Sequence, residues 1–436
     1  MSRPWSATRG ASNSSPKQTA SAQIVSVQRM KNIPDAVVIG SGPCGSYTAL
    51  KLAQRGVKVT VFEEHNQIGF PSHCAGHISI KGLANLGLLP LPKEIVENTF
   101  YAAHFHSPNG NKFSVRFQSP VTYAVDRALF DKQLADKATD AGAEYSLSSR
   151  VESLTIEDGF IKGVAVKHNN RTEKKTAGIV LDAEGVSSRL LRQTGLAGLD
   201  RHMLVNGVEA EVEDVKDVEP DAVEVFLGEE YAPGFYGWLI PKKDGKAKVG
   251  LGARKGNPKQ LLQKLMTKHP AASRKLQSAR ILQTSFHPIT LGGPVKQPYS
   301  NGFLAVGDAA SQVKPTTGGG VVFGLTCANI AAEVASEALS RNDVSAAFLR
   351  AYQTRCNEAV GFDARTMLRM RKTLDLIPDK RLDDMIAMCA RFGLDKTLQK
   401  VKDIDFQGRT LLHTLRSPRT LTALGYFFLV YLSANL

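Results

Sequence analysis

The hydrophobic residues of the N-terminal part of the chain fall into short unbroken runs, each followed by a turn. Residues 36–39 (Ala-Val-Val-Ile) lead into a glycine-rich turn, and residues 57–62 form a second apolar run. Continuous apolar runs of this length are typical of strands that are buried on both faces, as in parallel sheets. The two runs and the turn between them predict a β-α-β unit over residues 33–64.

Similar runs return later in the chain, at residues 179–182 and 303–306, and the pattern between them is different. There, shorter segments alternate apolar and polar residues, which predicts strands of an antiparallel sheet with one face packed. These alternating segments are residues 203–212, 222–227, 237–240, 246–252 and 281–289, and residues 112–117, earlier in the chain, alternate in the same way.

Helical spacing of apolar residues predicts helices at residues 126–142, 325–339 and 346–364. The pattern as a whole predicts an α/β (α+β) fold with a Rossmann-like nucleotide domain, an inserted antiparallel-sheet domain for the substrate and a helical C-terminal region. The expected boundaries are 33–98 with 120–195 and 290–340 for the nucleotide domain, 99–119 with 196–289 for the sheet domain, and 341–436 for the helical region.

The first glycine-rich turn has the spacing of a dinucleotide-binding fingerprint. Gly40 permits the tight turn, Gly42 the approach of a phosphate, and Gly45 the close contact of helix and strand. Glu63, which ends the second apolar run, stands where a carboxylate accepts hydrogen bonds from an unphosphorylated adenosine ribose, unless it only caps a strand end. Asp308 follows the last apolar run and is well placed for a ribityl or ribose hydroxyl. The two motifs in this order favour FAD.

The net charge indicates what kind of partner to expect, and the cysteine content indicates the redox compartment. The net charge of +14 indicates an anionic partner, such as a membrane surface, a phosphorylated substrate or an acidic electron carrier. No helix-turn-helix, zinc-finger or RNA-binding signature is present, so nucleic acid is not expected. The five cysteines are odd in number and scattered, which argues against a disulfide framework and a metal site and for a reducing cytosol.

The two ends of the chain each leave alternatives open. Residues 1–32 contain no acidic residue, and either form a disordered tail or reflect an upstream start, with Met30 as the alternative first residue. The apolar run at residues 424–432 lies near Arg416 and Arg419, and predicts either a buried terminal helix or a helix at a membrane interface.

Three further segments make the chain resemble the geranylgeranyl reductase family, within the aromatic-hydroxylase type of FAD fold. Residues 70–76 (Phe-Pro-Ser-His-Cys-Ala-Gly) match the Pro-x-x-Cys-x-Gly loop of that family, and residues 233–241 resemble its Tyr-x-Trp-x-Phe-Pro motif, with Leu-Ile replacing the usual bulky pair. Residues 314–321 (Lys-Pro-Thr-Thr-Gly-Gly-Gly-Val) are similar to the archaeal branch, the digeranylgeranylglycerophospholipid reductases. The resemblance extends from about residue 33 to 345 and is loose in the helical tail.

The resemblance implies a set of FAD contacts. Glu63 would hold the adenosine ribose, Arg127 would reach the pyrophosphate region unless it is a solvated helix-start charge, and Asp308 would bind the ribityl chain. A glycine-rich turn before a helix supplies free N–H groups and a positive dipole end, which stabilise an anionic reduced flavin. Backbone or side-chain contacts are expected from Gly40, Gly42, Cys44, Gly45, Cys74, Ala75, Gly76, Val151, Gly320 and Val321.

The same resemblance implies where the chemistry takes place. Cys74 is the leading candidate for the proton donor beside the flavin, with His73 and His77 as relays; alternatively Cys74 only packs against the cofactor. In an apolar site the thiol would stay protonated. No metal is expected to take part.

Three residues are candidates for binding the substrate. Tyr236 and Trp238 alternate along a strand, so they share a face and would either wall a tunnel for a prenyl chain or fill the core. Lys372 belongs to a basic cluster with Arg365, Arg369 and Arg371, which would receive a lipid phosphate unless it is a solvated helix face.

The function that the resemblance implies is the FAD-dependent saturation of C=C bonds in the geranylgeranyl chains of membrane ether-lipid precursors. The alternatives are reduction of geranylgeranyl diphosphate or a chlorophyll-type prenyl chain, a flavin monooxygenase, and a quinone-linked electron-transfer flavoprotein. The electron donor would be NADPH or reduced ferredoxin. The protein would be cytoplasmic, with peripheral contact to an anionic surface at the inner face of the cell membrane.

Overall fold

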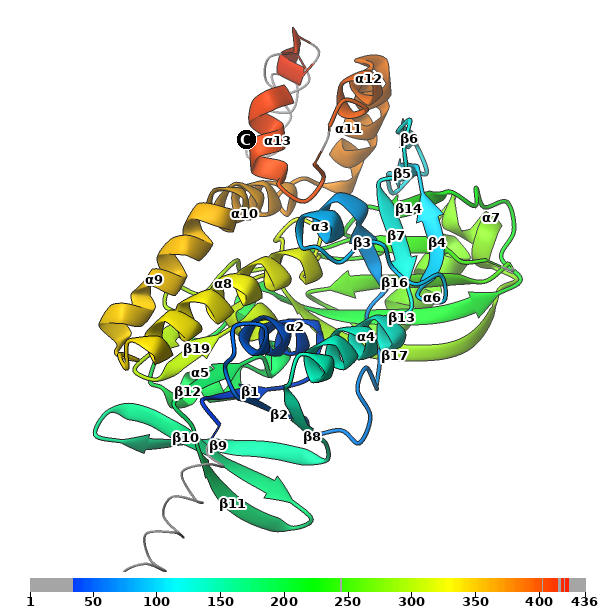
Figure 1. Ribbon diagram of the computed structural model, residues 1–436. Coiled ribbons are helices and arrows are strands. Elements are labelled where there is room, and N and C mark those ends of the chain that lie inside the picture. Colours follow the sequence, from blue (N-terminus) through cyan, green and yellow to red (C-terminus); the bar gives the residue numbers. More distant parts are fainter. Residues whose placement is uncertain (1–33, 244, 402, 415–416, 419, 423–436) are drawn as a thin grey trace, which may run out of the picture.

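The computed structural model describes residues 34–243, 245–401, 403–414, 417–418 and 420–422 (Figure 1). The expectations for residues 1–32 and 424–432 therefore lie outside the described residues.

A six-stranded sheet forms the centre of the nucleotide-binding part. Its order is β18-β19-β12-β1-β2-β8, and all neighbours are parallel except β18 and β19. The four predicted apolar runs supply its central strands, because strands buried on both faces must be apolar throughout. The strands are β1 (Ala36–Ile39), β2 (Val59–Phe62), β8 (Glu144–Ser146), β12 (Ile179–Asp182), β18 (Tyr299–Ser300) and β19 (Phe303–Ala305).

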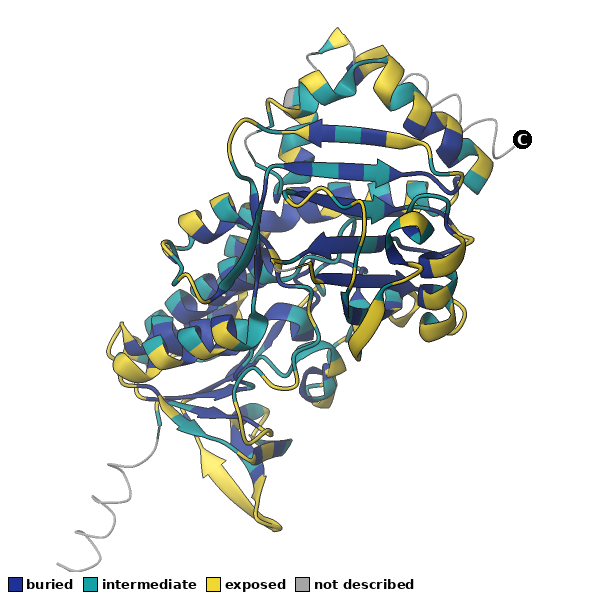
Figure 2. Cartoon of the chain, turned by 90° about the vertical axis from the view of Figure 1, so that its right-hand side faces the viewer, coloured by how far each residue is buried: buried dark blue, intermediate teal, exposed yellow. Residues whose placement is uncertain are grey.

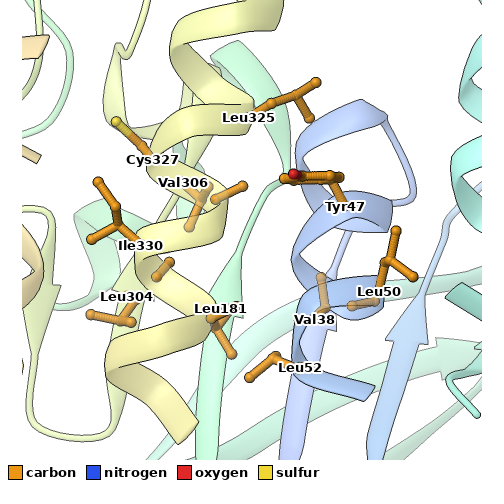
Figure 3. Close-up of a cluster of buried hydrophobic side chains, with 14 of the residues drawn as sticks. Val38, Tyr47, Leu50, Leu52, Leu181, Leu304, Val306, Leu325, Cys327 and Ile330 are labelled. Carbon is orange, nitrogen blue, oxygen red and sulfur yellow. The ribbon is translucent and has the colours of Figure 1, made fainter. Parts of the chain in front are cut away.

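Helices cover one face of this sheet. They are α2 (Pro43–Ala53), α4 (Arg127–Asp140) and α8 (Val321–Ser340). Figure 3 shows Tyr47 of α2 beside Leu325 of α8. By length and composition α8 is apolar enough to cross a membrane, but 61% of its apolar window is buried inside the protein, which fits a core helix.

A second sheet covers the opposite face, and the sequence pattern did not predict it. It contains β9 (Ser149–Glu157), β10 (Phe160–His168) and β11 (Arg171–Thr176), and α5 (Arg189–Gln193) packs beside it. Strand β11 is exposed along its whole length and appears yellow at the lower end of Figure 2. Such a strand has no apolar face, so alternation gives no signal for it.

The predicted antiparallel segments form a seven-stranded sheet, with the order β17-β13-β16-β15-β14-β5-β6. One pair departs from the expected pattern, since β14 and β5 run parallel. One face packs on α6 (Pro258–Lys268) and α7 (Ala272–Leu276), and the other faces the nucleotide-binding part. The strands are β5 (Ala102–His106), β6 (Lys112–Arg116), β13 (Leu204–Glu213), β14 (Ala222–Phe226), β15 (Gly237–Pro241), β16 (Ala247–Ala253) and β17 (Arg280–Thr290).

A small third sheet, β3 (His77–Ser79), β7 (Thr122–Val125) and β4 (Val96–Phe100), joins the two parts, and α3 (Ile80–Asn85) follows β3. The C-terminal region is helical, as predicted; in Figure 1 its first helix lies beside α8 at the left and the later ones lie at the top. A π-helical turn (Asn357–Gly361) links the first two of them. They are α9 (Ala346–Cys356), α10 (Phe362–Leu374), α11 (Asp379–Arg391), α12 (Leu394–Leu398) and α13 (Gln407–Thr414).

Candidate active site

One large cavity lies where the two main sheets and the C-terminal helices meet. Its volume is about 1110 Å³, and its wall includes Gly40, Ala183 and Asp308, which follow the carboxyl ends of β1, β12 and β19. Open α/β sheets bind ligands at this edge. Pockets for a single small ligand usually measure roughly 300–1,000 Å³, so the space suits a cofactor together with a second ligand.

The glycine turn after β1 is shaped for a pyrophosphate. Gly40 has a φ of +90°, and a Cβ on Gly45 would lie 1.9 Å from the Gly40 carbonyl oxygen, so helix and turn touch directly. A Cβ on Gly42 would meet no protein atom within 4 Å. Helix α2 begins at Pro43 without a side-chain cap, which leaves its first N–H groups to bind an anion. Gly40, Gly42 and the helix start thus fit the pyrophosphate of FAD.

Glu63 is buried in the cavity wall at the end of β2. Its Oε2 accepts from the Ser41 amide and hydroxyl, both at 2.8 Å, and its Oε1 accepts from the His65 amide at 2.9 Å. Burial alone would raise the pKa of Glu63, but the bonds from His65 and Ser41 lower it below its ordinary value. The carboxylate is therefore charged and bound to the glycine turn, so it does more than cap a strand end.

Arg127 and Asp308 lie on the same wall. Arg127 forms two hydrogen bonds of 3.0 Å with Asp131 one helical turn later, and its side chain is only 11% exposed, so the alternative of a solvated charge is wrong. Burial raises the pKa of Asp308, and the positive charge of Arg127 offsets part of this rise. Asp308 keeps free acceptor capacity towards the cavity, as a hydroxyl-binding residue requires.

The start of α8 also opens into the cavity. Gly318 has a φ of +67°, and Gly320 precedes the helix without any side-chain cap, so the free N–H groups and positive dipole end face the cavity near Gly320 and Val321. The Tyr236 hydroxyl donates to the Thr317 carbonyl at 2.7 Å and fixes this turn against the seven-stranded sheet. The turn fits the anionic edge of a reduced flavin.

The remaining predicted cofactor residues divide into two groups. Cys44, Ala75 and Val151 line the cavity, whereas Gly45 and Gly76 do not appear in its wall. The absence of side chains in those two glycines serves packing, since a Cβ on Gly76 would lie 2.1 Å from the Val125 carbonyl oxygen.

Cys74 does not have the apolar surroundings that the sequence suggested. It is exposed towards the cavity, and its thiol interacts with the Arg127 guanidinium, whose pKa is raised by Asp131 and Cys74 despite the opposing effect of burial. Cys74 therefore lies beside the cofactor site, as predicted from the sequence, and its role as proton donor stays a prediction.

The predicted relay histidines are neutral groups in this structure. Burial, and next the charge of Lys314, lower the pKa of His77 to about 4, and its Nε2 lies 2.7 Å from the Thr122 hydroxyl. His73 stacks on His287 with ring centroids 5.6 Å apart, and burial lowers the pKa of both, that of His287 to about 4. His287 was missed, although its place on an alternating strand was the available signal.

Tyr236 and Trp238 share one side of the sheet, as predicted, with ring centroids 6.0 Å apart, and both line the cavity. Two glycines of β16 make room for the rings of Trp238 and of Phe235, which precedes β15. A Cβ on Gly250 would lie 2.5 Å from the Trp238 ring, and one on Gly252 would lie 2.6 Å from Phe235. The binding of substrate by Tyr236 and Trp238 stays a prediction.

An apolar arm of the cavity runs from Trp238 between the seven-stranded sheet and the C-terminal helices. On the sheet side it is lined by Phe105, Val115, Val223, Val225, Leu227 and Ile240, and on the helical side by Leu374, Ile377, Leu382, Leu398 and Val401.

Lys372 requires a correction, because its side chain is exposed and absent from the cavity wall. Its neighbour Arg371 is buried in that wall and pairs with Asp375, with Nε 2.7 Å from Oδ1. One residue turns an α-helix by about 100°, so adjacent side chains face different directions. Arg371 is also not the solvated residue that the alternative expected.

Among the described residues no group of three or more His, Cys, Asp or Glu side chains is placed to hold a metal ion.

Comparison with known proteins agrees with this site. The FAD binding domain family matches residues 34–361. A geranylgeranyl bacteriochlorophyll reductase-like protein from Thermoplasma acidophilum superposes with a TM-score of 0.80 at 25% identity, over 91% of this chain and 99% of that one. The flavin-dependent brominase Bmp2 shares the fold, with a TM-score of 0.66 at 20% identity over 84% of this chain and 93% of that one. The fold and site define an FAD-dependent oxidoreductase.

Curated relatives narrow the class further. Digeranylgeranylglycerophospholipid reductase 2 of Methanopyrus kandleri is 35% identical over 355 residues, which cover 80% of this chain and 88% of that protein. The digeranylgeranylglycerophospholipid reductase of Methanosarcina acetivorans is 33% identical over 82% of this chain and 88% of that protein. The chain belongs to the digeranylgeranylglycerophospholipid reductase family.

Proposed function

We propose that the protein uses FAD to saturate C=C bonds in the geranylgeranyl chains of membrane ether-lipid precursors. The observation that carries this proposal is the continuity of one cavity, which joins the FAD-binding turns to an arm lined by apolar side chains. The names of the relatives supply the substrate class.

The apolar arm suits a linear hydrocarbon chain. Its walls are aliphatic and aromatic side chains from the sheet and from α10 to α12, so a prenyl chain that enters it leaves water. Burial of apolar surface contributes roughly 25 cal/mol per Å², which favours long chains over short ones. Trp238 stands where the arm meets the cofactor-binding part, and its ring would orient the chain there.

The division of labour follows from the chemistry of an isolated alkene. FAD, once reduced, supplies a hydride to one carbon, and the protein must supply a proton to the other. Glu63, Arg127, Asp308 and the amides at Gly320 and Val321 hold the cofactor, while Tyr236 and Trp238 position the chain.

We also propose peripheral contact with the inner, anionic face of the cell membrane. Leu376, Leu412 and Leu421 of the C-terminal region are 53–55% exposed, and the net charge is +14. Exposed apolar side chains on a basic protein favour adsorption to anionic lipid surfaces. The lipid body would stay in the bilayer while one chain enters the arm.

The same positive charge supports an acidic protein such as reduced ferredoxin as the electron donor, with NADPH as the alternative. Flavin reduction rates measured anaerobically with each donor distinguish the two.

The function itself is tested without oxygen. The FAD-loaded protein is reduced with dithionite and mixed with digeranylgeranylglyceryl phospholipid, and with geranylgeranyl diphosphate in a parallel reaction. Mass gains in steps of two hydrogens, coupled to flavin reoxidation, are the expected result with the phospholipid. A flavin that stays reduced beside unchanged lipid would refute the proposal, and a gain only with the diphosphate would change the carrier.

A further inference from the structure

A carboxyl group that none of the sequence motifs includes lies in the cavity wall. Glu209 is the sixth residue of β13, and Gly250 of β16 is its register neighbour; Trp238 of β15 is in turn the register neighbour of Gly250. Because Gly250 has no side chain, the Trp238 indole reaches over it, and its Nε1 donates to Glu209 Oε2 at 3.1 Å. Glu209 and Trp238 therefore form a hydrogen-bonded pair on the floor of the cavity, which is the side formed by the seven-stranded sheet.

The position of Glu209 on the seven-stranded sheet brings it next to the glycine turn before α8, the cofactor turn. Two residues earlier on β13, Gly207 is paired with Gly252 and His287, and a Cβ on Gly252 would lie 2.6 Å from the Phe235 ring. A Cβ on Gly318 of that turn would lie 3.0 Å from Phe235 and Ile289, so the turn rests on this part of the sheet. Two residues along a strand span about 7 Å. Glu209 thus lies one row beyond the cofactor turn, at the start of the apolar arm.

The charges around Glu209 come from four elements. Lys248 of β16 donates to Glu97 of β4 at 2.6 Å, and Lys242, after β15, lies 2.8 Å from both Glu97 and Glu211. Burial raises the pKa of Glu209 to about 7; Lys248 and the Trp238 indole oppose the rise, and Glu97 and Glu211 add to it.

The histidines near Glu209 are less suited than Glu209 to donate a proton to an alkene. On β17 the groups towards Glu209 are its register neighbour Ser285 and the next residue on that face, His287. His287 and His77 are neutral above about pH 4. A carboxyl that holds its proton up to neutral pH and can release it is the group that protonation of an alkene requires.

We propose that Glu209 is the catalytic acid, which delivers the proton to the alkene while Trp238 holds its carboxyl group in place. This proposal rests on the proposed function. One alkene carbon accepts a hydride, with its two electrons, from the reduced cofactor, and the other accepts the carboxyl proton of Glu209. The π bond breaks, two C–H bonds form, the flavin is oxidised by two electrons, and the Glu209 carboxylate regains a proton from water.

The first test needs no turnover. The chain has two tryptophans, Trp5 and Trp238, so indole ¹⁵N labelling of the FAD-loaded protein gives few signals, and Trp5→Phe assigns them. We expect the Trp238 indole signal to titrate with a midpoint near pH 7 and to lose this step in Glu209→Gln. A midpoint near pH 4, or a step that survives in Glu209→Gln, would overturn the proposal.

The second test follows the chemical step. In a single turnover of the reduced protein with lipid, the wild-type rate should fall above about pH 7, and Glu209→Gln should be at least about a hundredfold slower at pH 6. The matched control is Glu213→Gln at the end of the same strand, which lies outside the cavity wall, pairs with Arg280 and should react at the wild-type rate. Equal rates in Glu209→Gln and wild type would overturn the proposal. Wild-type protein that leaves the lipid unchanged would instead refute the proposed function.

A third variant separates an acid from a residue that only supports Trp238. Trp238→Phe removes the indole donor but keeps a ring, so Glu209 should still protonate the alkene, with the alkaline fall in rate moved to higher pH because one bond to the carboxylate is lost. If Trp238→Phe abolished the reaction as fully as Glu209→Gln, without any pH shift, the role of Glu209 would be structural.

Discussion

The Trp238 indole nitrogen lies 3.1 Å from a Glu209 carboxylate oxygen, across a strand that presents only a glycine between them. This relationship joins three strands of the seven-stranded sheet. It brings a hydrophobic ring and an ionisable group to the same point of a cavity that is otherwise divided between polar cofactor turns and an apolar arm.

Gly250 is the first place to test this arrangement. In Gly250→Ala the added Cβ would lie 2.5 Å from the Trp238 ring and 2.6 Å from the Val208 carbonyl oxygen, so the indole must move. Overpacking of this kind costs roughly 1–3 kcal/mol of stability. We expect a lower melting temperature and a shifted Trp238 indole signal. In the control Gly198→Ala the methyl meets only the flexible Arg192 side chain at 3.3 Å, and little should change.

The glycine turn after β1 allows a paired experiment. Gly42→Ala adds a methyl group where no protein atom lies within 4 Å, so the apoprotein should keep its melting temperature while FAD binds at least about tenfold more weakly. Gly45→Ala collides with the Gly40 carbonyl oxygen at 1.9 Å and should impair folding itself. FAD titration and thermal unfolding measure both; unchanged FAD affinity in Gly42→Ala would place the pyrophosphate elsewhere.

Stability should depend on pH through Glu209. Burial raises the pKa of Glu209 from an ordinary 4.5 to about 7 in the folded protein, so the folded state binds the proton more tightly, and the stability this provides is lost as pH rises from about 4.5 through 7. This rise in pKa corresponds to about 3 kcal/mol. Glu209→Gln should therefore melt higher than wild type at pH 8 and show a smaller gain at pH 5. A gain that is equal at both pH values would contradict the raised pKa.

Arg371 and Lys372 are adjacent and should behave differently. Arg371→Ala removes a buried partner of Asp375 and should cost roughly 2 kcal/mol, with weaker use of lipid. Lys372→Ala changes an exposed side chain and should stay within about 0.5 kcal/mol of wild type. Melting curves and the KM for lipid measure both effects. Equal losses of lipid affinity in the two variants would restore Lys372 as a contact.

Much of this organisation was readable from local patterns. The apolar runs at β1, β2, β12 and β19 became the parallel strands, and the alternating segments became the antiparallel sheet, because burial on two faces or on one leaves a direct mark on the sequence. The glycine turns were readable for the same reason, since φ values such as +90° at Gly40 favour glycine.

What was missed depends on contacts between distant segments. Glu209 reads as one polar residue in an alternating strand, and only the register with Gly250 and Trp238 places it in the cavity. The guanidinium beside Cys74 comes from a helix that starts 53 residues later, at Arg127, so the surroundings of the thiol could not be inferred from its own loop. The exposed strand β11 carries no periodic signal at all.

Lys248 has a consequence for what the cavity admits. Its ammonium group donates to the Ala75 carbonyl at 3.3 Å and to the Val125 carbonyl at 3.4 Å, besides Glu97, so it spans from the floor strand β16 to the loop that carries Cys74. The distance between β16 and the loop that carries Cys74 is therefore set here by the length of the Lys248 side chain. The thickness of the molecule that can pass beneath Cys74 is then governed by a residue outside the cavity wall, and a shorter side chain at this position would change the selectivity for the substrate.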